Sequence, residues 1–174
     1  MLWKKEGVKR VYRIGFGVDS HRFEAVSTGK KLMLGGIEIP HPVGMESHSD
    51  GDVILHALYN ALASALGEGS IGTAFPDSKE ENQGRDSKEF VAHILQKTRQ
   101  EGYIIQNVGV SLECKTPKIN PHEKAFKESI AQLLGIKVEQ VAVHATTGES
   151  LTAVGKGKGI YTQVIVLLEK HQKR

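Results

Sequence analysis

The sequence predicts an α/β protein of the α+β kind, a single domain in which helices pack on one face of a mixed sheet. Five strand-like runs, several with β-branched residues at alternate positions, lie at 11–17, 31–39, 104–114, 138–145 and 160–168. Three helical segments separate them, and strand and helix alternate in the second half of the chain. With 174 residues, one domain over 11–169 is expected, between a basic N-terminal extension at 1–10 and a basic tail at 170–174.

The first helix is expected at 52–66, where apolar residues recur with the helical period. Its stripe, which would face the core, consists of Ile54, Leu58, Ala61, Leu62 and Ala65. His56 lies roughly opposite this stripe. Judged on this helix alone, His56 is therefore expected to be exposed to solvent.

Two further helices have sequence signals at their ends. One begins with Asp86 and Glu89 spaced as a capping box, and the other has Asn120 as its cap with Glu123 as the box partner. The last helix should end before Gly135, because glycine commonly follows a helix C-terminus.

Composition and charge exclude several classes of protein. Hydrophobic residues make up 39% of the chain, and the net charge of +3 comes from the ends, because residues 11–168 carry a net charge of −2. A nucleic-acid-binding domain would concentrate Lys and Arg on its folded body, so nucleic acid is not expected as a partner. The sequence has neither an apolar run of about 18 residues nor a signal peptide, so no membrane partner is expected and the cytoplasm is the expected location. Residues 76–87 are polar throughout and are expected to form an exposed loop.

Few side chains stand out as nucleophiles. Cys114 is the only cysteine, which excludes an intramolecular disulfide and a multi-thiolate zinc site. No histidine flanks Cys114 in the sequence, so this thiol is not expected to act as a nucleophile. The hydroxyl residues that belong to no grouping suggestive of chemistry are Ser87, Thr98 and Ser129.

Asp19 and His21, a carboxylate and an imidazole, lie two residues apart at the end of the first strand, so their side chains share one face. Taken alone, such a pair more often forms a structural hydrogen bond than a metal site. A second cluster around the start of the first helix favours a divalent ion, and it consists of His48, Asp50, Asp52 and His56. Three protein ligands with an open fourth position are typical of catalytic zinc, and Asp19, His21 and His56 would supply them.

Three segments have residues suited to phosphate. The run GKGKG at 155–159 offers backbone amides and two lysines, but its spacing excludes a P-loop, and a hairpin turn is an equal alternative. Lys118 precedes the third helix, whose N-terminal end favours anions. Thr146, Thr147 and Glu149 follow a strand end, where two hydroxyls and a carboxylate can meet a phosphate and its metal.

Six segments, in this order, show a family resemblance: GFGVDSHRF, LGGIEIPH, HSDGDVILHAL, IGTAFPD, TPKINPH and ATTGESL. Over residues 13–168 the chain resembles the 2-C-methyl-D-erythritol 2,4-cyclodiphosphate synthases. The resemblance implies a lyase of isoprenoid biosynthesis, in the methylerythritol phosphate pathway, and a homotrimer with sheets facing its centre and active sites between subunits. The implied substrate is a small CDP-linked molecule, 4-diphosphocytidyl-2-C-methyl-D-erythritol 2-phosphate. Its 2-phosphate would attack the β-phosphate with metal assistance, giving the cyclic diphosphate and CMP.

The resemblance assigns two metal sites. Asp19, His21 and His56 match the family's ligands of Zn²⁺ or another divalent ion. Glu149 matches a ligand of a second ion, Mg²⁺ or Mn²⁺, which the substrate diphosphate shares.

Substrate contacts are implied in the same way. His48 and Ser49 match a phosphate-contacting loop, and His48 and Thr147 stand where the family stabilises the transition state. The nucleotide side is implied to consist of Thr146, Lys118 and the backbone of 114–117. In full, the implied substrate-binding residues are Asp19, His21, His48, Ser49, Ser70, Gly72, Asp77, Cys114, Pro117, Lys118, Thr146, Thr147, Glu149 and Lys156.

Some positions depart from the family's pattern. Acids are usual where Asn60, Ser70 and Lys79 stand, so the expected differences concern contacts with the erythritol hydroxyls rather than the metal chemistry. Phe and Arg are frequent where Ala153 and Lys156 stand, which predicts weak or no binding of an isoprenoid diphosphate in the trimer cavity. These departures leave an alternative open, a non-catalytic trimer that binds metal and nucleotide on the same scaffold.

Overall fold

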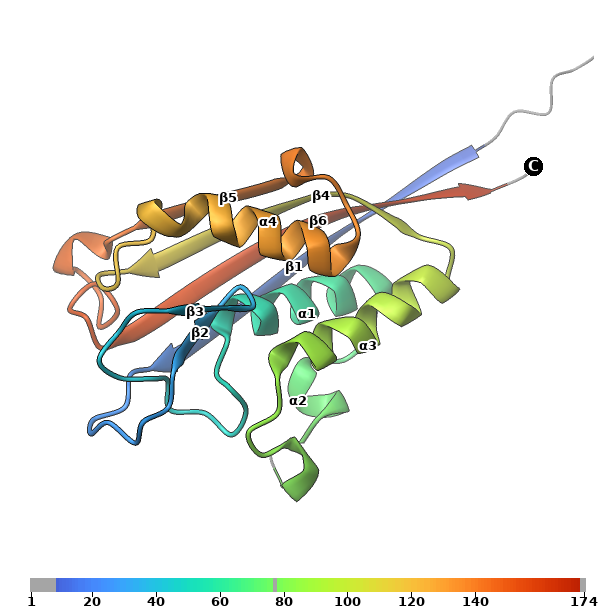
Figure 1. Ribbon diagram of the computed structural model, residues 1–174. Coiled ribbons are helices and arrows are strands. Elements are labelled where there is room, and N and C mark those ends of the chain that lie inside the picture. Colours follow the sequence, from blue (N-terminus) through green and yellow to red (C-terminus); the bar gives the residue numbers. More distant parts are fainter. Residues whose placement is uncertain (1–8, 77, 173–174) are drawn as a thin grey trace, which may run out of the picture.

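A four-stranded mixed sheet runs through the computed structural model, which describes residues 9–76 and 78–172 (Figure 1). Its strands are β1 (Lys9–Arg22), β4 (Ile104–Cys114), β5 (Val141–Thr146) and β6 (Gly159–Gln172), in the order β1-β6-β4-β5. β6 is antiparallel to both β1 and β4, whereas β4 and β5 are parallel. The mixed sheet expected from the sequence is thereby confirmed.

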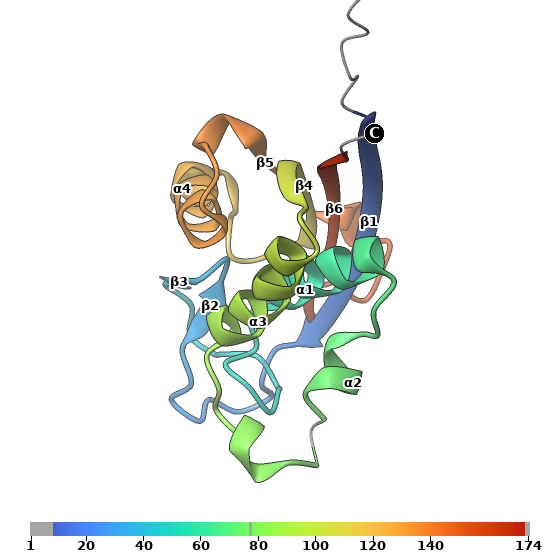
Figure 2. The same ribbon diagram turned by 90° about the vertical axis from the view of Figure 1, so that its right-hand side faces the viewer.

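The longer helices lie on one face of this sheet, as Figure 2 shows. They are α1 (Val53–Leu66), α3 (Ser87–Gln100) and α4 (Glu123–Leu134). The shorter elements are β2 (Leu32–Leu34), β3 (Ile37–Ile39), α2 (Ile71–Ala74) and the 3₁₀ turns η1 (Glu80–Asn82), η2 (Asn120–His122), η3 (Val138–Gln140) and η4 (Gly148–Ser150). Among the residues described, no helix has the length and apolar character needed to cross a membrane.

The inner face of β1 is shaped to receive α1. Gly15 and Gly17 let the helix come close, because a side-chain carbon on either glycine would collide with the backbone of Ala61. The alternation of the strand places Asp19 and His21 on this same face, further along β1. The two glycines therefore bring the predicted carboxylate–histidine pair next to α1.

The outer face of β1 is apolar and exposed. Ile14, Phe16 and Val18 are 68%, 55% and 40% exposed, and Ile165 of β6, which pairs with Phe16, is 48% exposed. These four residues are called the outer sheet face below. The longer helices α1, α3 and α4 lie on the opposite side of the sheet (Figure 2). Exposed apolar faces of this kind often mark interaction sites in soluble proteins.

Two expected strands differ from the observed ones. The run 31–39 is the hairpin of β2 and β3, because Gly35 and Gly36 both have positive φ and turn the chain. The run 138–145 begins with the 3₁₀ turn η3, and the strand itself starts at Val141.

The helix starts were predicted in part. Asp86 caps α3, since its carboxylate accepts the N–H two residues on at 2.8 Å. The Glu89 carboxylate pairs instead with Arg85, 2.8 Å away, so the expected capping box is wrong. α4 begins at Glu123 after the turn η2 and has no side-chain cap, so Asn120 does not cap it.

Parts of both basic ends belong to the sheet. Lys9 and Arg10 pair with the last residues of β6, and Lys170 pairs with Val11 of β1. The β1–β6 ribbon therefore extends into both of these segments, and Lys9 and Arg10 are exposed on it.

Candidate active site

Asp19 and His21 of β1 meet His56 of α1, as the sequence predicted. Asp19 Oδ2, His21 Nε2 and His56 Nδ1 form a triangle in which each pair of atoms is 3.1 Å apart. Ligand atoms bound at about 2.0–2.1 Å to one tetrahedral zinc ion lie about 3.3 Å from each other. The three side chains, called the triad below, therefore fit as three of the four ligands of a divalent ion.

The electrostatics of the triad suit a cation. Burial alone would raise the pKa of Asp19, but its side-chain contacts with the His21 and His56 rings outweigh the effect of burial and hold that pKa well below its usual range. Asp19 is therefore ionised at neutral pH. One carboxylate and two neutral imidazoles make a donor set that divalent transition metals prefer.

His56 is buried, which corrects the expectation that it is exposed. Only 7% of His56 is exposed, because α3 covers the side of α1 that faces away from β1. Phe90 of α3 packs beside the imidazole, with ring centroids 5.8 Å apart. The helical period identifies the side that faces the sheet, but it does not show that a second helix covers the other side.

Two hydroxyl groups contact the second ring nitrogen of His56. Nε2 lies 2.9 Å from Ser87 Oγ and 3.1 Å from Ser49 Oγ. Ser87 is fully buried, and its hydroxyl donates to the Asp50 carboxylate. Sequence reasoning missed Ser87, because 31 residues separate it from His56 and only the packing of α3 on α1 brings the two together.

Asp52, another acid of the predicted cluster, has a structural task. Its fully buried carboxylate accepts hydrogen bonds from the N–H groups of Ile54 and Leu55 in the first turn of α1. It also accepts from Gly35 and Gly36, at 2.8 and 2.6 Å. Asp52 therefore caps α1 and joins it to the β2–β3 hairpin.

The triad lines a cavity of about 540 Å³, called the metal cavity below. His48 and Ser49, from the loop before α1, and Gly72 of α2 line it as well. The remaining lining residues are Glu46, Ser47, Ile71, Phe75, Asn82 and Phe90. Ser70 precedes α2 without lining this cavity, and Asp77 lies outside the described residues.

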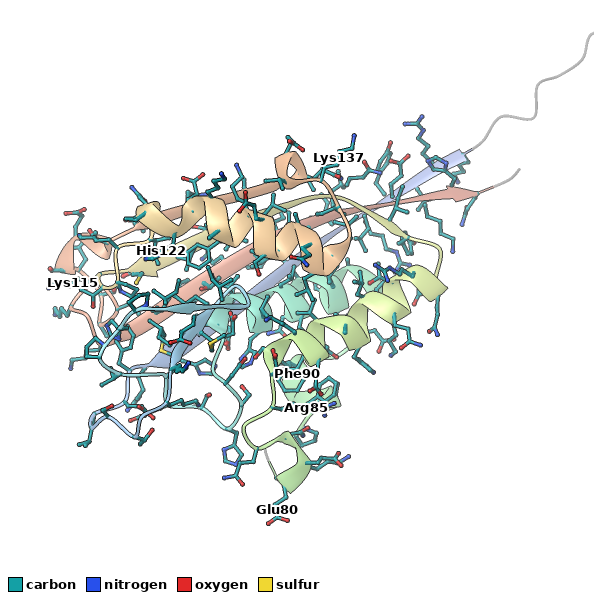
Figure 3. The ribbon with its side chains drawn as sticks, viewed as in Figure 1. Glu80, Arg85, Phe90, Lys115, His122 and Lys137 are labelled. Atoms are coloured by element: carbon teal, nitrogen blue, oxygen red, sulfur yellow. The ribbon has the colours of Figure 1, made fainter. Side chains whose placement is uncertain are left out.

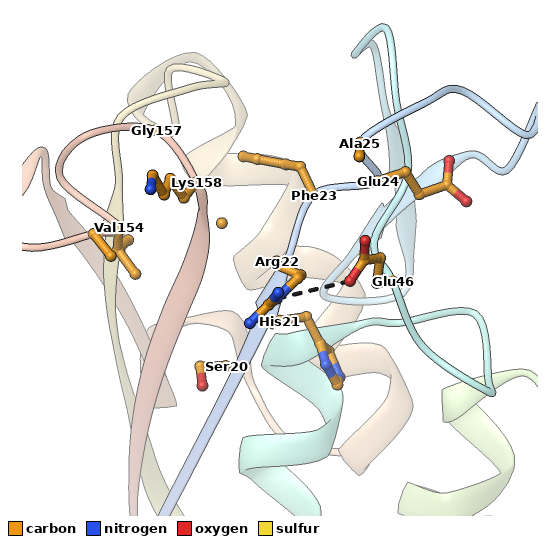
Figure 4. A pocket seen from close by; sticks show the side chains of 12 residues that line it. Ser20, His21, Arg22, Phe23, Glu24, Ala25, Glu46, Val154, Gly157 and Lys158 are labelled. Atoms are coloured by element: carbon orange, nitrogen blue, oxygen red, sulfur yellow. Dashed lines mark ion pairs between the residues drawn. The ribbon is translucent and has the colours of Figure 1, made fainter.

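A cavity of about 790 Å³ adjoins the metal cavity and shares His21 and Glu46 with it. Arg22 lies at the boundary, with its Nε 3.7 Å from the Glu46 carboxylate (Figure 4). The GKGKG run forms a turn beside this cavity, where Lys158 lines the wall and Lys156 is exposed. The run is therefore a turn before β6 but not a hairpin, because β6 pairs with β1 and β4 and not with β5.

A third cavity, of about 340 Å³, lies at the ends of β4 and β5. It is called the nucleotide cavity below, after the ligand that the sequence predicted for its residues. Its lining residues are Cys114, Lys118, Ile119, Asn120, Ala145, Thr146 and Thr147. It shares no lining residue with the metal cavity in the described part of the chain. Figure 3 shows Lys115 among the loops at this end, whereas Phe90 lies on α3 beside the metal cavity. One chain thus holds the predicted site in two separate places.

Glu149 lies in a strained turn after β5. Its φ is 47° and that of Ser150 is 63°, values that residues other than glycine adopt only rarely. Thr147 Oγ1 donates to the Glu149 carboxylate over 2.9 Å and fixes its direction. Strained backbone is concentrated at functional sites, which agrees with the role predicted for this carboxylate.

The Cys114 thiol is buried and makes hydrogen bonds with the segment that follows β4. Burial raises the pKa of Cys114 to about 12, and its thiol donates to the carbonyl groups of Thr116 and Pro117. A neutral, internally bonded thiol is a poor nucleophile, as expected from the sequence.

Asn60 stands where the resemblance described above implies an acid. Its Nδ2 donates to the Val18 carbonyl of β1 over 3.2 Å, and its Oδ1 accepts the Ile71 N–H of α2 at 2.9 Å. An ionised aspartate only accepts hydrogen bonds and would lose the first contact. Asn60 therefore joins three elements around the metal cavity.

Comparisons with known proteins agree with this architecture. A family model described as the YgbB family matches residues 12–169. A 2-C-methyl-D-erythritol 2,4-cyclodiphosphate synthase from Marinobacter nauticus is 44% identical over 157 residues, which cover 90% of this chain and 97% of the relative. A solved structure of such a synthase in a CDP-bound form is 36% identical with a TM-score of 0.80, covering 90% and 99% of the two chains. The structure of IspF from Plasmodium falciparum in complex with CDP is 33% identical with a TM-score of 0.78, covering 90% and 95%.

Proposed function

Because the chain belongs to the YgbB family of 2-C-methyl-D-erythritol 2,4-cyclodiphosphate synthases, we propose that it makes this cyclic diphosphate from 4-diphosphocytidyl-2-C-methyl-D-erythritol 2-phosphate. CMP is the second product, so the enzyme is a phosphorus–oxygen lyase. The observation that carries the proposal is the triad, which presents three ligand atoms 3.1 Å apart at the wall of a cavity.

The reaction is an intramolecular displacement at phosphorus. An oxygen of the substrate's 2-phosphate forms a bond to the β-phosphorus, while the bond from this phosphorus to the oxygen shared with the α-phosphate breaks. CMP leaves with that oxygen and its negative charge. Because both reacting groups belong to one substrate, the protein must supply charge stabilisation and a fixed geometry, and no protein nucleophile is needed.

Two ions fit the residues present. Asp19, His21 and His56 would hold Zn²⁺, and Glu149 would hold Mg²⁺ or Mn²⁺ together with the substrate diphosphate. When bound, these ions polarise the phosphate oxygens and neutralise charge on the departing CMP.

The chain's own donors surround the same oxygens. His48 and Ser49 line the metal cavity and would donate hydrogen bonds to the phosphate beside the triad. Once its hydroxyl turns from Glu149 to the substrate, Thr147 would donate to the oxygens that gain charge in the transition state, while Lys118 and Thr146 would bind the nucleotide side.

The active site is shared between neighbouring subunits of a homotrimer. The metal cavity and the nucleotide cavity have no lining residue in common, which supports a site that a second chain completes. The outer sheet face supplies an apolar surface on which such an assembly can form, with the sheets facing its centre.

Phosphorus NMR tests the proposed reaction. The purified protein is mixed with the CDP-linked substrate, with and without a chelator, and the appearance of CMP and of a cyclic diphosphate is followed. We expect both products only when a divalent ion is present. Substrate binding without products, in protein shown to contain metal, would favour the alternative of a non-catalytic binding protein, and inorganic phosphate in place of the cyclic product would indicate a hydrolase.

A further inference from the structure

We propose that Ser87, held by Asp50, is the positioning residue that orients His56 toward the ion, an inference that rests on the proposed metal site. The family resemblance assigns no role to either residue. Both belong to the layer behind the ligands, which commonly decides how strongly a histidine binds its metal.

Asp50 fixes Ser87 through two contacts. Its Oδ2 accepts the Ser87 N–H at 3.0 Å, and its Oδ1 accepts the Ser87 hydroxyl. Oδ1 also accepts the Asp52 N–H at 3.1 Å, next to the start of α1. The Ser87 hydroxyl, at the first residue of α3 and fully buried, therefore has a defined direction.

This arrangement determines where the proton of the His56 ring lies. An ionised carboxylate only accepts hydrogen bonds, so the Ser87 hydroxyl proton points to Asp50. Ser87 Oγ then faces His56 Nε2 at 2.9 Å as an acceptor, and Nε2 must carry a proton. In a neutral imidazole, Nδ1 is left with its lone pair free.

That lone pair points into the triad. His56 Nδ1 lies 3.1 Å from both Asp19 Oδ2 and His21 Nε2. A lone pair and a carboxylate oxygen at this distance repel each other unless positive charge lies between them. The Asp50–Ser87 pair thus prepares His56 as a ligand, and the ion supplies the missing charge.

Ser49 is the other hydroxyl near Nε2, but it lacks a comparable support. Its Oγ lies 3.1 Å from Nε2 and accepts the Gly51 N–H at 3.2 Å, and no described hydrogen bond joins it to a carboxylate. The Ser49 proton therefore has no fixed direction and stays free for the phosphate. We assign positioning to Ser87 and substrate contact to Ser49.

A purely structural role for Ser87 makes a different prediction. The Asp50–Ser87 contacts join the starts of α1 and α3, so their loss would lower stability without a specific effect on the ion. Thr98→Val offers a matched control, because Thr98 lies on the same helix, is 1% exposed and donates only to the Ile94 carbonyl at 2.8 Å. This change also removes a buried hydroxyl from α3, at a position away from the triad.

The test measures metal affinity and geometry directly. Wild-type protein, Ser87→Ala, Asp50→Asn, Ser49→Ala and Thr98→Val are stripped of metal, checked by circular dichroism, and titrated with Zn²⁺ against a chromophoric chelator. Visible spectra of the Co²⁺-loaded proteins report the coordination geometry. We expect Ser87→Ala to weaken Zn²⁺ binding about 10- to 100-fold and to alter the Co²⁺ spectrum. Asp50→Asn should cause a smaller loss, because the neutral amide still accepts from Ser87, and Thr98→Val should bind as wild type does.

The outcomes separate this inference from the function on which it rests. Wild-type protein that binds neither ion would overturn the metal site and the positioning role together. Tight wild-type binding that Ser87→Ala and Asp50→Asn leave unchanged would overturn the positioning role alone. An equal loss in Ser87→Ala and Thr98→Val would also contradict it, since both would then act through general stability. If Ser87→Ala does not fold, the comparison of Asp50→Asn with Thr98→Val decides the question by the same criterion.

Discussion

The metal cavity and the nucleotide cavity differ in how deeply their predicted site residues are buried and in the elements that carry them. The triad comes from β1 and α1, is at most about one-fifth exposed at each side chain, and has a buried second layer from α3. In the nucleotide half, Lys118, Thr146 and Glu149 are exposed and lie in or next to loops at the strand ends. The metal half is thus assembled within one chain, whereas these residues of the nucleotide half lie open to solvent.

Because of this difference, we expect substitutions in different parts of the chain to affect the two halves. Changes in the core around β1 and α1 should act on the metal half within each chain. Changes on the outer sheet face should leave that half intact and separate it from the nucleotide half of the neighbouring subunit.

The largest expected effect is the loss of a triad ligand. His56→Ala should lower turnover by at least about 10² to 10³-fold, because the cavity loses the cation that stabilises transition-state charge. Steady-state release of CMP measures this effect. The exposed His93 of α3 provides the control, and His93→Ala should retain normal turnover. Near-normal activity of His56→Ala would contradict the assignment of His56 as a metal ligand.

A charge on the outer sheet face should prevent the proposed trimer from forming and so separate the metal half of one subunit from the nucleotide half of the next. Phe16→Glu places a charge in the proposed contact between sheets, so we expect monomers by light scattering and a large loss of turnover. Zn²⁺ binding should persist, because the triad lies on the other face of β1. Val26 is 78% exposed but lies outside the sheet, so Val26→Glu should remain trimeric and active. A trimeric, active Phe16→Glu protein would contradict this surface assignment.

A side chain placed between β1 and α1 should push the two elements apart and displace the triad. Gly17→Ala inserts a methyl group against the backbone of Ala57 and should lower the free energy of unfolding by about 1–3 kcal/mol, with weaker Zn²⁺ binding. Urea unfolding and chelator competition measure the two effects. In Gly109→Ala the new carbon meets only the Ile165 side chain, at 3.1 Å, so a smaller effect is expected. Equal results for both variants would mean that close β1–α1 packing does not position the triad.

The smallest expected effect concerns the bridge at Asn60. Asn60→Asp should lower the free energy of unfolding by about 1–2 kcal/mol, because a carboxylate oxygen would face the Val18 carbonyl. Urea unfolding at neutral pH measures it. A stability equal to that of wild type would show that this contact with β1 contributes nothing.

The sequence predicted most of the sheet and the metal half of the site. Strand alternation showed that Asp19 and His21 share a face, and this prediction is confirmed by their meeting with His56. The helical periodicity of the sequence did not show that α3 covers the far side of α1. The covering residues Phe90 and Ser87 belong to a helix that is distant in sequence. Periodicity describes one element at a time, and the second layer of a site depends on contacts between elements.

Local signals also failed where glycine turned the chain. The run 31–39 has the composition of one strand, but Gly35 and Gly36 fold it into a hairpin that delivers two N–H groups to Asp52. The sequence motifs also did not predict that their residues would lie in two separate cavities. Residues that meet in a site shared between chains need not lie close together in one chain.

Mixing two inactive variants tests the shared active site most directly. His56→Ala removes the metal half, and Thr147→Ala removes a donor of the nucleotide half. When the two proteins are unfolded and refolded together, random mixed trimers contain some sites in which both halves are wild type. We predict roughly a quarter of wild-type turnover from an equal mixture, because each site would combine halves from two subunits. No activity above that of the separate variants, in trimers shown by mass spectrometry to be mixed, would contradict the account.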